Sequence, residues 1–450
     1  MNLNVPAQAQ GETSSLMRGR RRLGLYFWGI AGVLCVLAIG VVSGISALNT
    51  ADEADIDTRL AEPAADAEQI QRGAYLARAG NCQSCHTQAG AAAYAGGAGI
   101  QTPFGVVYAG NLTPDKKTGL GSWSASHFWR AMHNGRSKDG RWLNPAFPYA
   151  QYTRLTRTDA DDIFAYLRSL PAVEQRNRDH ALRFPYNTQM ALALWRALYF
   201  KPLHHQPLPD QSVQWNRGLY LVEGLGHCAA CHSPRNALGA AVKDRHLSGG
   251  MMPSEKWYAP SLLSMTEAGV MDWPAADVVQ LLQSGRTPQA HVSGPMASVV
   301  FGSTQYLKDD DLTAMAVYLK NLPKTEQAIA PAQAVARAPA ADGTERQRGA
   351  RLYEKHCAEC HGDQGEGKAG VYPALRGNRA VTMDNTANLI SVIHQGGFGP
   401  VTEKNPRPYG MPPFGHTLSH REMAELITFL RQSWGNQASS VTELDVLRGR

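Results

Sequence analysis

The pattern of apolar and polar positions separates one long apolar run from many shorter amphipathic segments. Residues 23–48 form a run of 26 residues that contains no charge. A helix needs about 20 such residues to cross the hydrocarbon core of a membrane, so this run predicts a transmembrane helix. No later stretch is apolar over a comparable length. The sequence therefore predicts a single membrane span near the N-terminus.

The charges that flank this run are asymmetric. Four arginines lie between positions 18 and 22, whereas four acidic residues follow the run between positions 52 and 57. Positively charged flanks favour the cytoplasmic side, so the N-terminus is expected there and the rest of the chain outside. The alternative is a cleaved signal peptide, with residues 45–47 as a weak cleavage site, but its apolar core is usually only 7–15 residues long. Both interpretations export the bulk of the chain.

Helical patterns then recur in three similar groups. Each group opens with an Arg-Gly step inside a short apolar and aromatic segment, and it closes with a segment whose apolar residues fall at i, i+3 and i+4. The glycine predicts a close helix crossing, so each closing helix is expected to lie across its opening helix. The opening steps are Arg72-Gly73, Arg217-Gly218 and Arg348-Gly349, and the closing pairs are Tyr166-Leu167, Tyr318-Leu319 and Phe429-Leu430.

Each group also carries one C-x-x-C-H motif shortly after its opening segment. Two thiols at this spacing match two vinyl groups at the edge of a porphyrin, and the adjacent histidine then lies under the iron as its proximal ligand. A zinc site would need two more ligands per motif, and a redox dithiol does not need the histidine. We therefore predict three covalently bound haem c groups, attached through Cys82, Cys85, Cys228, Cys231, Cys357 and Cys360, with His86, His232 and His361 as iron ligands.

The sixth iron ligand is expected in the loop before each closing helix. In the third group Met411 stands there, followed by two prolines that would stiffen the loop. In the second group Met296 occupies the equivalent place. A methionine ligand raises the reduction potential and is typical of electron carriers. Competing methionines in the second group are Met251, Met252, Met265 and Met271.

The first group departs from this pattern, because Phe147 stands where a methionine would fit and phenylalanine cannot bind iron. His133 is the predicted ligand, which would give a haem with two histidine ligands and a lower potential. Met132 beside it is an alternative, and an open sixth position is a third. His133 could also be an ordinary polar residue at a helix end, where it suits the helix dipole.

These patterns predict a mostly α protein with one N-terminal transmembrane helix followed by three class I-like cytochrome c domains. The connection between the first two domains is rich in large apolar residues and is expected to pack across both, the alternative being a surface for a partner or the membrane interface. The boundaries are 1–22 for the cytoplasmic basic segment, 23–48 for the anchor, 49–66 for a linker, 67–174 for domain 1, 175–210 for the packed connection, 211–323 for domain 2, 324–343 for an Ala/Pro linker, 344–435 for domain 3 and 436–450 for a tail.

Composition narrows the possible partners. The chain holds 44 Lys and Arg against 38 Asp and Glu, a net charge of +6 with no long basic block outside the N-terminus. A nucleic-acid partner is therefore not expected. Seven cysteines are too few for a disulfide scaffold in 450 residues.

Several motifs resemble one known family, the membrane-bound three-haem cytochrome c subunits of bacterial periplasmic dehydrogenases for alcohols, aldehydes, gluconate and sugars. The resemblance covers residues 67–435. It is carried by residues 102–105 (TPFG), 111–115 (NLTPD), 144–149 (NPAFPY) and the stretch from Trp215 through the second motif to Asn236. Phe147 departs from the alcohol dehydrogenase branch and is more similar to the branch that accompanies molybdopterin-type aldehyde oxidoreductases. An uncleaved N-terminal anchor also differs from members with a cleaved leader and a C-terminal membrane helix.

The resemblance implies that this subunit does not oxidise the substrate itself. A catalytic subunit that holds molybdopterin, a quinone or a flavin would do so, with a small iron–sulfur subunit as a further partner. Electrons would pass through the haems to ubiquinone in the membrane or to a terminal oxidase. The implied location is the bacterial inner membrane, with a single span and the haem domains in the periplasm.

Two other functions compete with this interpretation. A haem without a strong sixth ligand can bind peroxide, so the first site could belong to a peroxidase-like enzyme. No acid–base histidine beside Phe147 supports that reaction. A free-standing membrane cytochrome that shuttles electrons between a quinol-oxidising complex and an oxidase is the second alternative.

Overall fold

The computed structural model describes residues 28, 30, 32–37, 39–50, 53, 56, 65–252, 254–324 and 343–449. The predicted cytoplasmic segment, most of the first linker and nearly all of the Ala/Pro linker lie outside the described residues. The chain divides into two compact units: residues 1–54 together with 190–201, and residues 55–189 together with 202–450.

The first unit contains the N-terminal apolar helix and most of α7 (Gln189–Tyr199). The apolar helix, Gly32–Thr50, is long and apolar enough to cross a membrane by its length and composition. Its last turn contacts α7 through Asn49. The Asn49 amide donates a hydrogen bond to the Ala193 carbonyl at 3.0 Å, and its side-chain oxygen accepts one from Arg196 Nε at 3.0 Å.

The second unit is mostly helical, as the sequence predicts. We call residues 67–174, 211–323 and 344–435 the first, second and third motif regions. The first holds α2 (Ala67–Ala79), α3 (Cys82–His86), α4 (Ala125–Asn134), α5 (Tyr149–Tyr152) and α6 (Arg157–Ser169). The second holds α8 (Val213–Leu219), the π-helical turn η1 (Tyr220–Leu225), α9 (Ala229–His232), η2 (Lys243–Arg245), α10 (Ala275–Ser284), α11 (Gly294–Gly302), η3 (Thr304–Tyr306) and α12 (Asp309–Lys320). The third holds α13 (Gly343–His356), α14 (Ala358–His361), α15 (Arg379–Thr382), α16 (Ala387–Gln395) and α17 (His420–Gln432), and α18 (Glu443–Arg448) follows it.

Short antiparallel strands complete the regions. Strands β1 (Gly99–Thr102) and β2 (Gly105–Tyr108) form a hairpin, and β3 (Ala181–Leu182) pairs with the free edge of β2. Strands β4 (Gly250–Met252) and β5 (Trp257–Ala259) form a second pair. In the third region β6 (Gly397–Phe398) pairs with β7 (Gly410–Met411), which places Met411 opposite Gly397.

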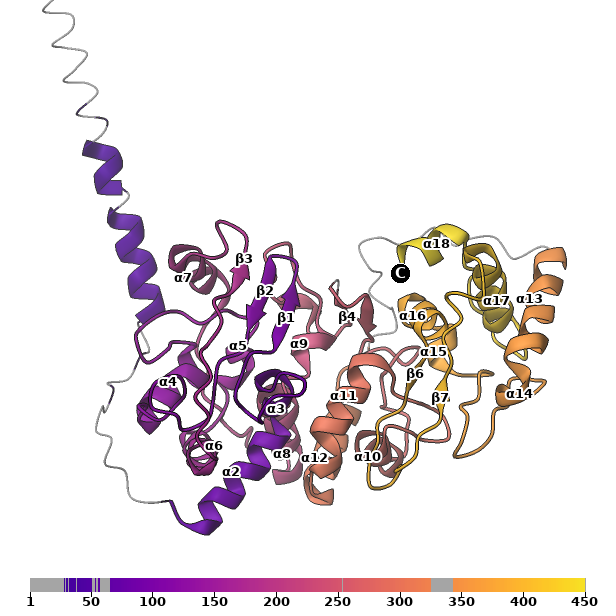
Figure 1. The fold of residues 1–450 in the computed structure, drawn as a ribbon, viewed down its shortest axis with the longest axis horizontal. Helices are drawn as coiled ribbons and strands as arrows, with labels where there is room; N and C mark the ends of the chain where they lie inside the picture. The colour runs from indigo at the N-terminus through magenta and orange to yellow at the C-terminus, as the bar shows by residue number, and fades with distance from the viewer. Residues whose placement is uncertain are drawn as a thin grey trace, which may run out of the picture. The chain divides into compact units, whose positions relative to one another are not determined.

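In each region the closing helix crosses the opening helix at the predicted glycine, with α2 against α6, α8 against α12 and α13 against α17 (Figure 1). A Cβ atom built on Gly73 would lie 1.9 Å from the Asp162 carbonyl oxygen. The corresponding distances are 2.1 Å from Gly218 to the Ala314 oxygen and 2.4 Å from Gly349 to the Glu425 oxygen. No side chain fits at these contacts, so the prediction of a close crossing is confirmed.

The arginine before each glycine has a second role at the crossing. Its guanidinium binds a carboxylate on the closing helix: Arg72 to Asp162 at 2.9 Å, Arg217 to Asp311 at 2.8 Å and Arg348 to Glu425 at 2.9 Å. Each carboxylate side chain is largely buried, which strengthens such a pair relative to an exposed one. The Arg-Gly step therefore fixes both the distance and the rotation of the two helices.

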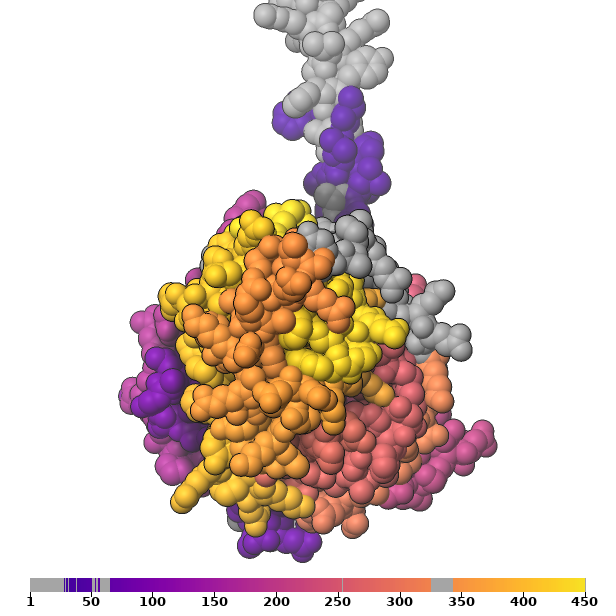
Figure 2. All heavy atoms as spheres, turned by 90° about the vertical axis from the view of Figure 1, so that its right-hand side faces the viewer, coloured from indigo at the N-terminus to yellow at the C-terminus, as the bar shows by residue number. Residues whose placement is uncertain are grey.

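Two apolar cores hold the second unit together. One cluster is shared by the first and second regions and includes Leu76, Leu167, Leu221 and Leu319. The third region has a separate cluster around Tyr353 and Leu426. The second and third regions touch along β5 and α16, where Tyr258 and Asn388 exchange two hydrogen bonds of 2.8 and 2.7 Å. Figure 2 shows the third region, in orange and yellow, adjoining the second region in salmon.

The connection at 175–210 does not behave as one packed segment. Its first part lies on the first region, where the side chain of Asn177 accepts a hydrogen bond from the Asn111 backbone N–H at 2.7 Å. Strand β3 extends that contact along β2. Helix α7, by contrast, belongs to the unit of the N-terminal helix and leaves Met190, Leu194 and Leu198 exposed.

Candidate haem-attachment sites

The three C-x-x-C-H motifs fold alike, each as a short helix that follows the opening helix of its region. Helix α3 spans the whole first motif, and α9 and α14 span most of the second and third. A short helical turn points the two cysteines and the histidine to one side, as attachment to one edge of a planar ring requires. The described cysteines form no disulfides.

Each motif histidine contacts a backbone carbonyl 12 to 28 residues further along the chain. The Nδ1 atom of His86 lies 2.7 Å from the Gly110 oxygen, that of His232 lies 2.6 Å from the Pro260 oxygen, and that of His361 lies 2.9 Å from the Pro373 oxygen. A carbonyl oxygen can only accept, so Nδ1 must carry the proton in all three rings. The Nε2 lone pair is then free to bind a metal.

Burial keeps these histidines neutral. It lowers the pKa of His86, His232 and His361, and the backbone hydrogen bond only partly opposes this effect. A neutral ring with a fixed tautomer is the form that ligates iron, because a protonated Nε2 has no lone pair to give. The three sites therefore fit a metal-bound histidine in tautomer, orientation and charge.

The thiols do not fit a redox site. Burial raises the pKa of Cys82 and Cys228 to about 12 and that of Cys357 to about 11. Catalytic dithiols need thiolates, which a lowered pKa favours. Among the described residues, no group of three or more His, Cys, Asp and Glu side chains could hold a metal ion. A thioether, which does not titrate, is compatible with such burial.

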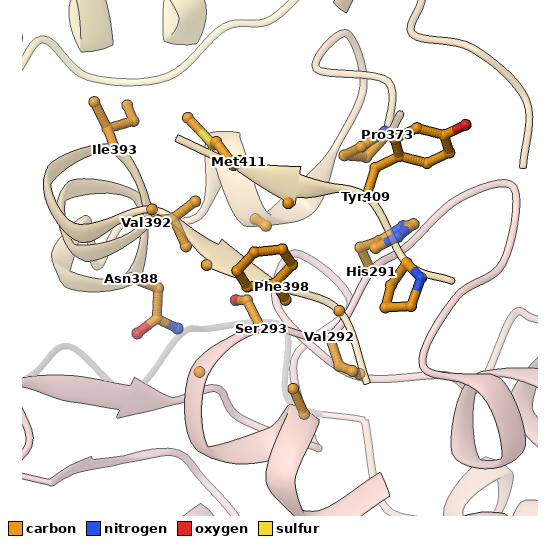
Figure 3. A pocket seen from close by; sticks show the side chains of 18 of the residues that line it. His291, Val292, Ser293, Pro373, Asn388, Val392, Ile393, Phe398, Tyr409 and Met411 are labelled. Carbon is orange, nitrogen blue, oxygen red and sulfur yellow. The ribbon is translucent and has the colours of Figure 1, made fainter. Parts of the chain in front are cut away.

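A cavity of about 940 Å³ opens beside the third motif. Cys357, Cys360 and His361 line it together with Met411, so the structure brings the predicted proximal and sixth ligands of the third site to one space. Figure 3 shows Met411 on β7 near Val392 and Ile393 of α16. The remaining apolar lining includes Phe414, Leu426 and Leu430. A large apolar cavity with few polar groups is typical of a cofactor site.

The same cavity extends to the second region. His291 and Val292 line it from that side, as Figure 3 shows, and so do Pro295 and Phe301 of α11. Met296 of α11 instead packs against the core shared by the first and second regions, the core against which Cys228 also packs. Helix α11 therefore faces two sites: one side contributes Met296 to the interior of the second region, and the other side is a wall of the third-region cavity.

The first region contains the least regular of the three candidate sites. His133 is buried, its ring stacks on Trp129 with a centroid distance of 4.5 Å, and it lies 4.7 Å from the ring of His204. Its Nδ1 atom is 3.5 Å from the Thr153 hydroxyl. These contacts all lie outside the first motif.

Met132, one residue earlier on α4, has different surroundings. Its side chain belongs to the shared core, against which Cys82 and Phe147 also pack. The Phe147 ring lies 5.4 Å from that of Tyr152, a buried residue of the same core. Met132 and Phe147 therefore pack against the same core as Cys82 of the first motif.

Two features of these sites could not be found in the sequence. The carbonyls of Gly110, Pro260 and Pro373 are backbone atoms, and no residue type signals them.

The second feature is Glu223 in the π-helical turn η1. Its buried carboxylate accepts hydrogen bonds from His246 at 2.8 Å and from the Tyr318 hydroxyl at 2.9 Å. The sequence shows only that an acidic residue lies four positions before His227, which does not indicate that it is buried.

Comparison with known proteins defines the class to which these sites belong. The model of the cytochrome c family matches residues 70–171 and 346–434, which correspond to the first and third motif regions. The chain is 38% identical over 410 residues to the cytochrome c subunit of a quinone alcohol dehydrogenase from Gluconacetobacter polyoxogenes, covering 87% of this chain and 86% of that one.

Two further relatives have corresponding names. The gluconate 2-dehydrogenase cytochrome c subunit of Pantoea cypripedii is 36% identical, with 86% of this chain and 90% of that one covered. The fructose dehydrogenase cytochrome subunit of Gluconobacter japonicus is 33% identical, with coverage of 83% and 81%. This chain belongs to the family of dehydrogenase cytochrome c subunits. The family implies covalently bound haem c, electron transfer and a catalytic dehydrogenase partner.

Proposed function

We propose that the protein is a membrane-anchored electron-transfer subunit with three haem c groups, which carries electrons from a periplasmic dehydrogenase to ubiquinone or a terminal oxidase. The observation that carries this proposal is the threefold repetition of one arrangement: a C-x-x-C-H helix whose histidine donates Nδ1–H to a backbone carbonyl. Bound haem c supplies a one-electron couple at its iron. The protein holds, orients and shields the group.

The proposed attachment residues are the six motif cysteines, and the proposed proximal ligands are His86, His232 and His361. Met411 is the proposed sixth ligand of the third site, supported by the cavity that it shares with His361. Met296 is the proposed sixth ligand of the second site, supported by its packing against the core with Cys228. Methionine ligands would give both sites the raised potential of a carrier.

For the first site we place Met132 before His133 as the candidate sixth ligand. Met132 shares the interior with Cys82, whereas the His133 ring is already held by Trp129, His204 and Thr153. The Thr153 contact is made through Nδ1, as the carbonyl contacts of the motif histidines are, so His133 stays the alternative ligand. An open sixth position at the first site is the other outcome that the test must separate.

The proposed location is the bacterial inner membrane, with the helix Gly32–Thr50 as the anchor and the motif regions in the periplasm. The length and composition of this helix support the anchor, and the arginines at 18–22 support the orientation. The proposed catalytic partner holds molybdopterin, a quinone or a flavin, with a small iron–sulfur subunit as an additional component. Phe147 favours an aldehyde-oxidising partner by its resemblance to that branch.

The test is to purify the full chain from its native membrane in mild detergent. We expect its mass to exceed that of the polypeptide by three haem groups, and we expect a cofactor-bearing dehydrogenase to co-purify. Adding that enzyme's substrate should reduce all three haems. In the same preparation carrying His232→Ala, the substrate should reduce fewer haems, because electrons stop at the altered second site. An exposed substitution such as Glu403→Gln should leave the reduction complete. A chain that comes out alone and consumes peroxide would contradict the proposal.

A further inference from the structure

Helix α7 carries an apolar stripe that no described residue covers. Met190, Leu194 and Leu198 are spaced by four residues, so they lie on one face of the helix. Their exposed fractions are 55%, 47% and 57%. Single exposed apolar residues are common on protein surfaces, but a continuous stripe along a helix marks a surface that contacts something apolar.

The helix is joined to the end of the predicted membrane anchor. Asn49 lies in the last turn of the helix Gly32–Thr50, and it bonds both to the Ala193 carbonyl and to Arg196 Nε. Arg196 is almost fully buried there. This polar contact holds the middle of α7 beside the last turn of the helix Gly32–Thr50. If that helix spans a membrane, its last turn lies at the membrane surface.

The length and aromatic content of α7 suit a position along that surface. Eleven residues of helix extend for roughly 16 Å, which is too short to cross a bilayer. Trp195 and Tyr199 lie side by side on α7, with ring centroids 5.7 Å apart. These two residue types concentrate where hydrocarbon meets water.

We propose that α7 lies in the membrane–water interface beside the anchor, with Met190, Leu194 and Leu198 in contact with lipid. The inference rests on the anchor assigned under the proposed function and adds a second lipid contact to it. A bilayer is the occupant that continuity with Gly32–Thr50 selects, because the stripe belongs to the same compact unit as the anchor. Two lipid contacts would restrict how the chain rotates about its single span.

The experiment is photo-crosslinking of the full chain in its native membrane. Cys35→Ala removes the reactive thiol in the apolar helix, and the motif cysteines are consumed by haem attachment in the proposed holoprotein. Leu194→Cys and Leu198→Cys are then labelled separately with a benzophenone maleimide. Val213→Cys is the matched control, because Val213 is 89% exposed on α8, in the other compact unit. Covalent haem content reports that each variant folds.

We expect phospholipid adducts at positions 194 and 198 that exceed those at position 213 several-fold. A protein adduct at position 194 would overturn the inference in favour of a partner surface, and labels that react no more with lipid than the label at 213 would overturn it as well. Membrane flotation separates this failure from that of the proposed function. A chain that floats with the membrane but forms no lipid adduct keeps its anchor and refutes only the role of α7, whereas a chain released from the membrane refutes both.

Discussion

The hydroxyl of Tyr75 donates a 2.6 Å hydrogen bond to the carboxylate of Asp311, which links the opening helix of the first region to the closing helix of the second. The reverse link exists as well: the Tyr220 hydroxyl, on η1 directly after α8, bonds to Asp159 of the first region's closing helix. Each tyrosine stands three residues after the arginine of its Arg-Gly step. The first two regions therefore exchange equivalent contacts, as two related halves of a pseudo-symmetric pair do.

The third region cannot join this exchange. The residue three positions after Arg348 is Arg351 rather than a tyrosine. The carboxylate at the place of Asp311 is Glu422, which is used within its own helix as the partner of Ser419 in a capping box. The third region, which lacks this exchange, also has an apolar core of its own.

Replacing Tyr75 by phenylalanine tests the link between the first two regions. We expect the free energy of unfolding to fall by about 1–2 kcal/mol, because a hydrogen bond to a charged group is lost. Asp311 keeps its two bonds to Arg217, so haem content should not change. The measurement is thermal unfolding at constant haem content. Tyr409→Phe, at an exposed tyrosine of the third region, is the control, and an equal loss of stability in both variants would contradict the prediction.

Gly73→Ala tests the helix crossing of the first region. The added Cβ would collide with the Asp162 carbonyl, so the two helices must separate at a cost of about 1–3 kcal/mol. Gly343→Ala is the matched control, because a Cβ there meets nothing within 4 Å. Chemical denaturation of both variants gives the comparison. Equal stability of the two variants would show that the crossing tolerates a methyl group.

Met411→Leu tests the sixth ligand of the third site. Leucine preserves the apolar volume but cannot bind iron. One of the three proposed haems should therefore titrate at a lower reduction potential, while the potentials of the other two stay unchanged. A spectroelectrochemical titration measures this. Met423→Leu, at a fully buried core methionine of the same region, should leave all three potentials unchanged. Unchanged potentials in the Met411 variant would remove this residue from the ligand set.

His133→Ala separates a ligand from a structural residue. If the contacts with Trp129 and His204 define its role, the variant loses stability by about 1–2 kcal/mol and keeps the low-spin spectrum of the first haem. Met132→Leu should then change that spectrum. Electron paramagnetic resonance of the oxidised protein distinguishes the two results. A new high-spin signal in His133→Ala alone would restore His133 as the ligand.

Glu223→Gln tests the pH dependence of the buried network beside the second motif. Burial raises the pKa of Glu223, but the hydrogen bonds from His246 and Tyr318 outweigh it, so the net pKa is lowered below the ordinary value of 4.5. The charged form is therefore favoured by folding, and its contribution to stability is present above pH 4.5 and lost as the pH falls below that value. The difference in unfolding midpoint between wild type and variant should therefore narrow as the pH falls from 7 to below 4.5. Glu403→Gln, at an exposed carboxylate, is the control.

Several features of the fold followed from short stretches of sequence. The helical period in residues such as Ile163, Tyr166 and Leu167 predicted the closing helices, and the Arg-Gly steps predicted where they are crossed. The carboxylate partners of those arginines did not follow, because Asp162 and Glu425 lie four residues before the closing aromatic residue whereas Asp311 lies seven before Tyr318. No fixed spacing links each pair.

The connection at 175–210 shows the limit of composition. Its large apolar residues predicted packing across the first two regions. Residues 203–208 do contact both, through Thr153 of the first and through Tyr220 and Asn216 of the second, whereas Phe184 and the stripe of α7 are exposed. Composition gives the number of apolar side chains, whereas their exposure depends on which element lies opposite. Helix α7 is bonded through Ala193 to Asn49, which lies 144 residues earlier in the chain.

The sequence by itself determined the features that depend on near neighbours in the chain. These are the three motifs, in which two cysteines and a histidine stand within five residues, the uncharged run of 26 residues, and the helices that flank each motif. The tertiary structure decided which carbonyl fixes each histidine, which methionine shares a cavity with His361, and how Tyr75 and Tyr220 join the first two regions. The physical reason is that spacing and periodicity act within a few residues, whereas these contacts join residues that only packing brings together.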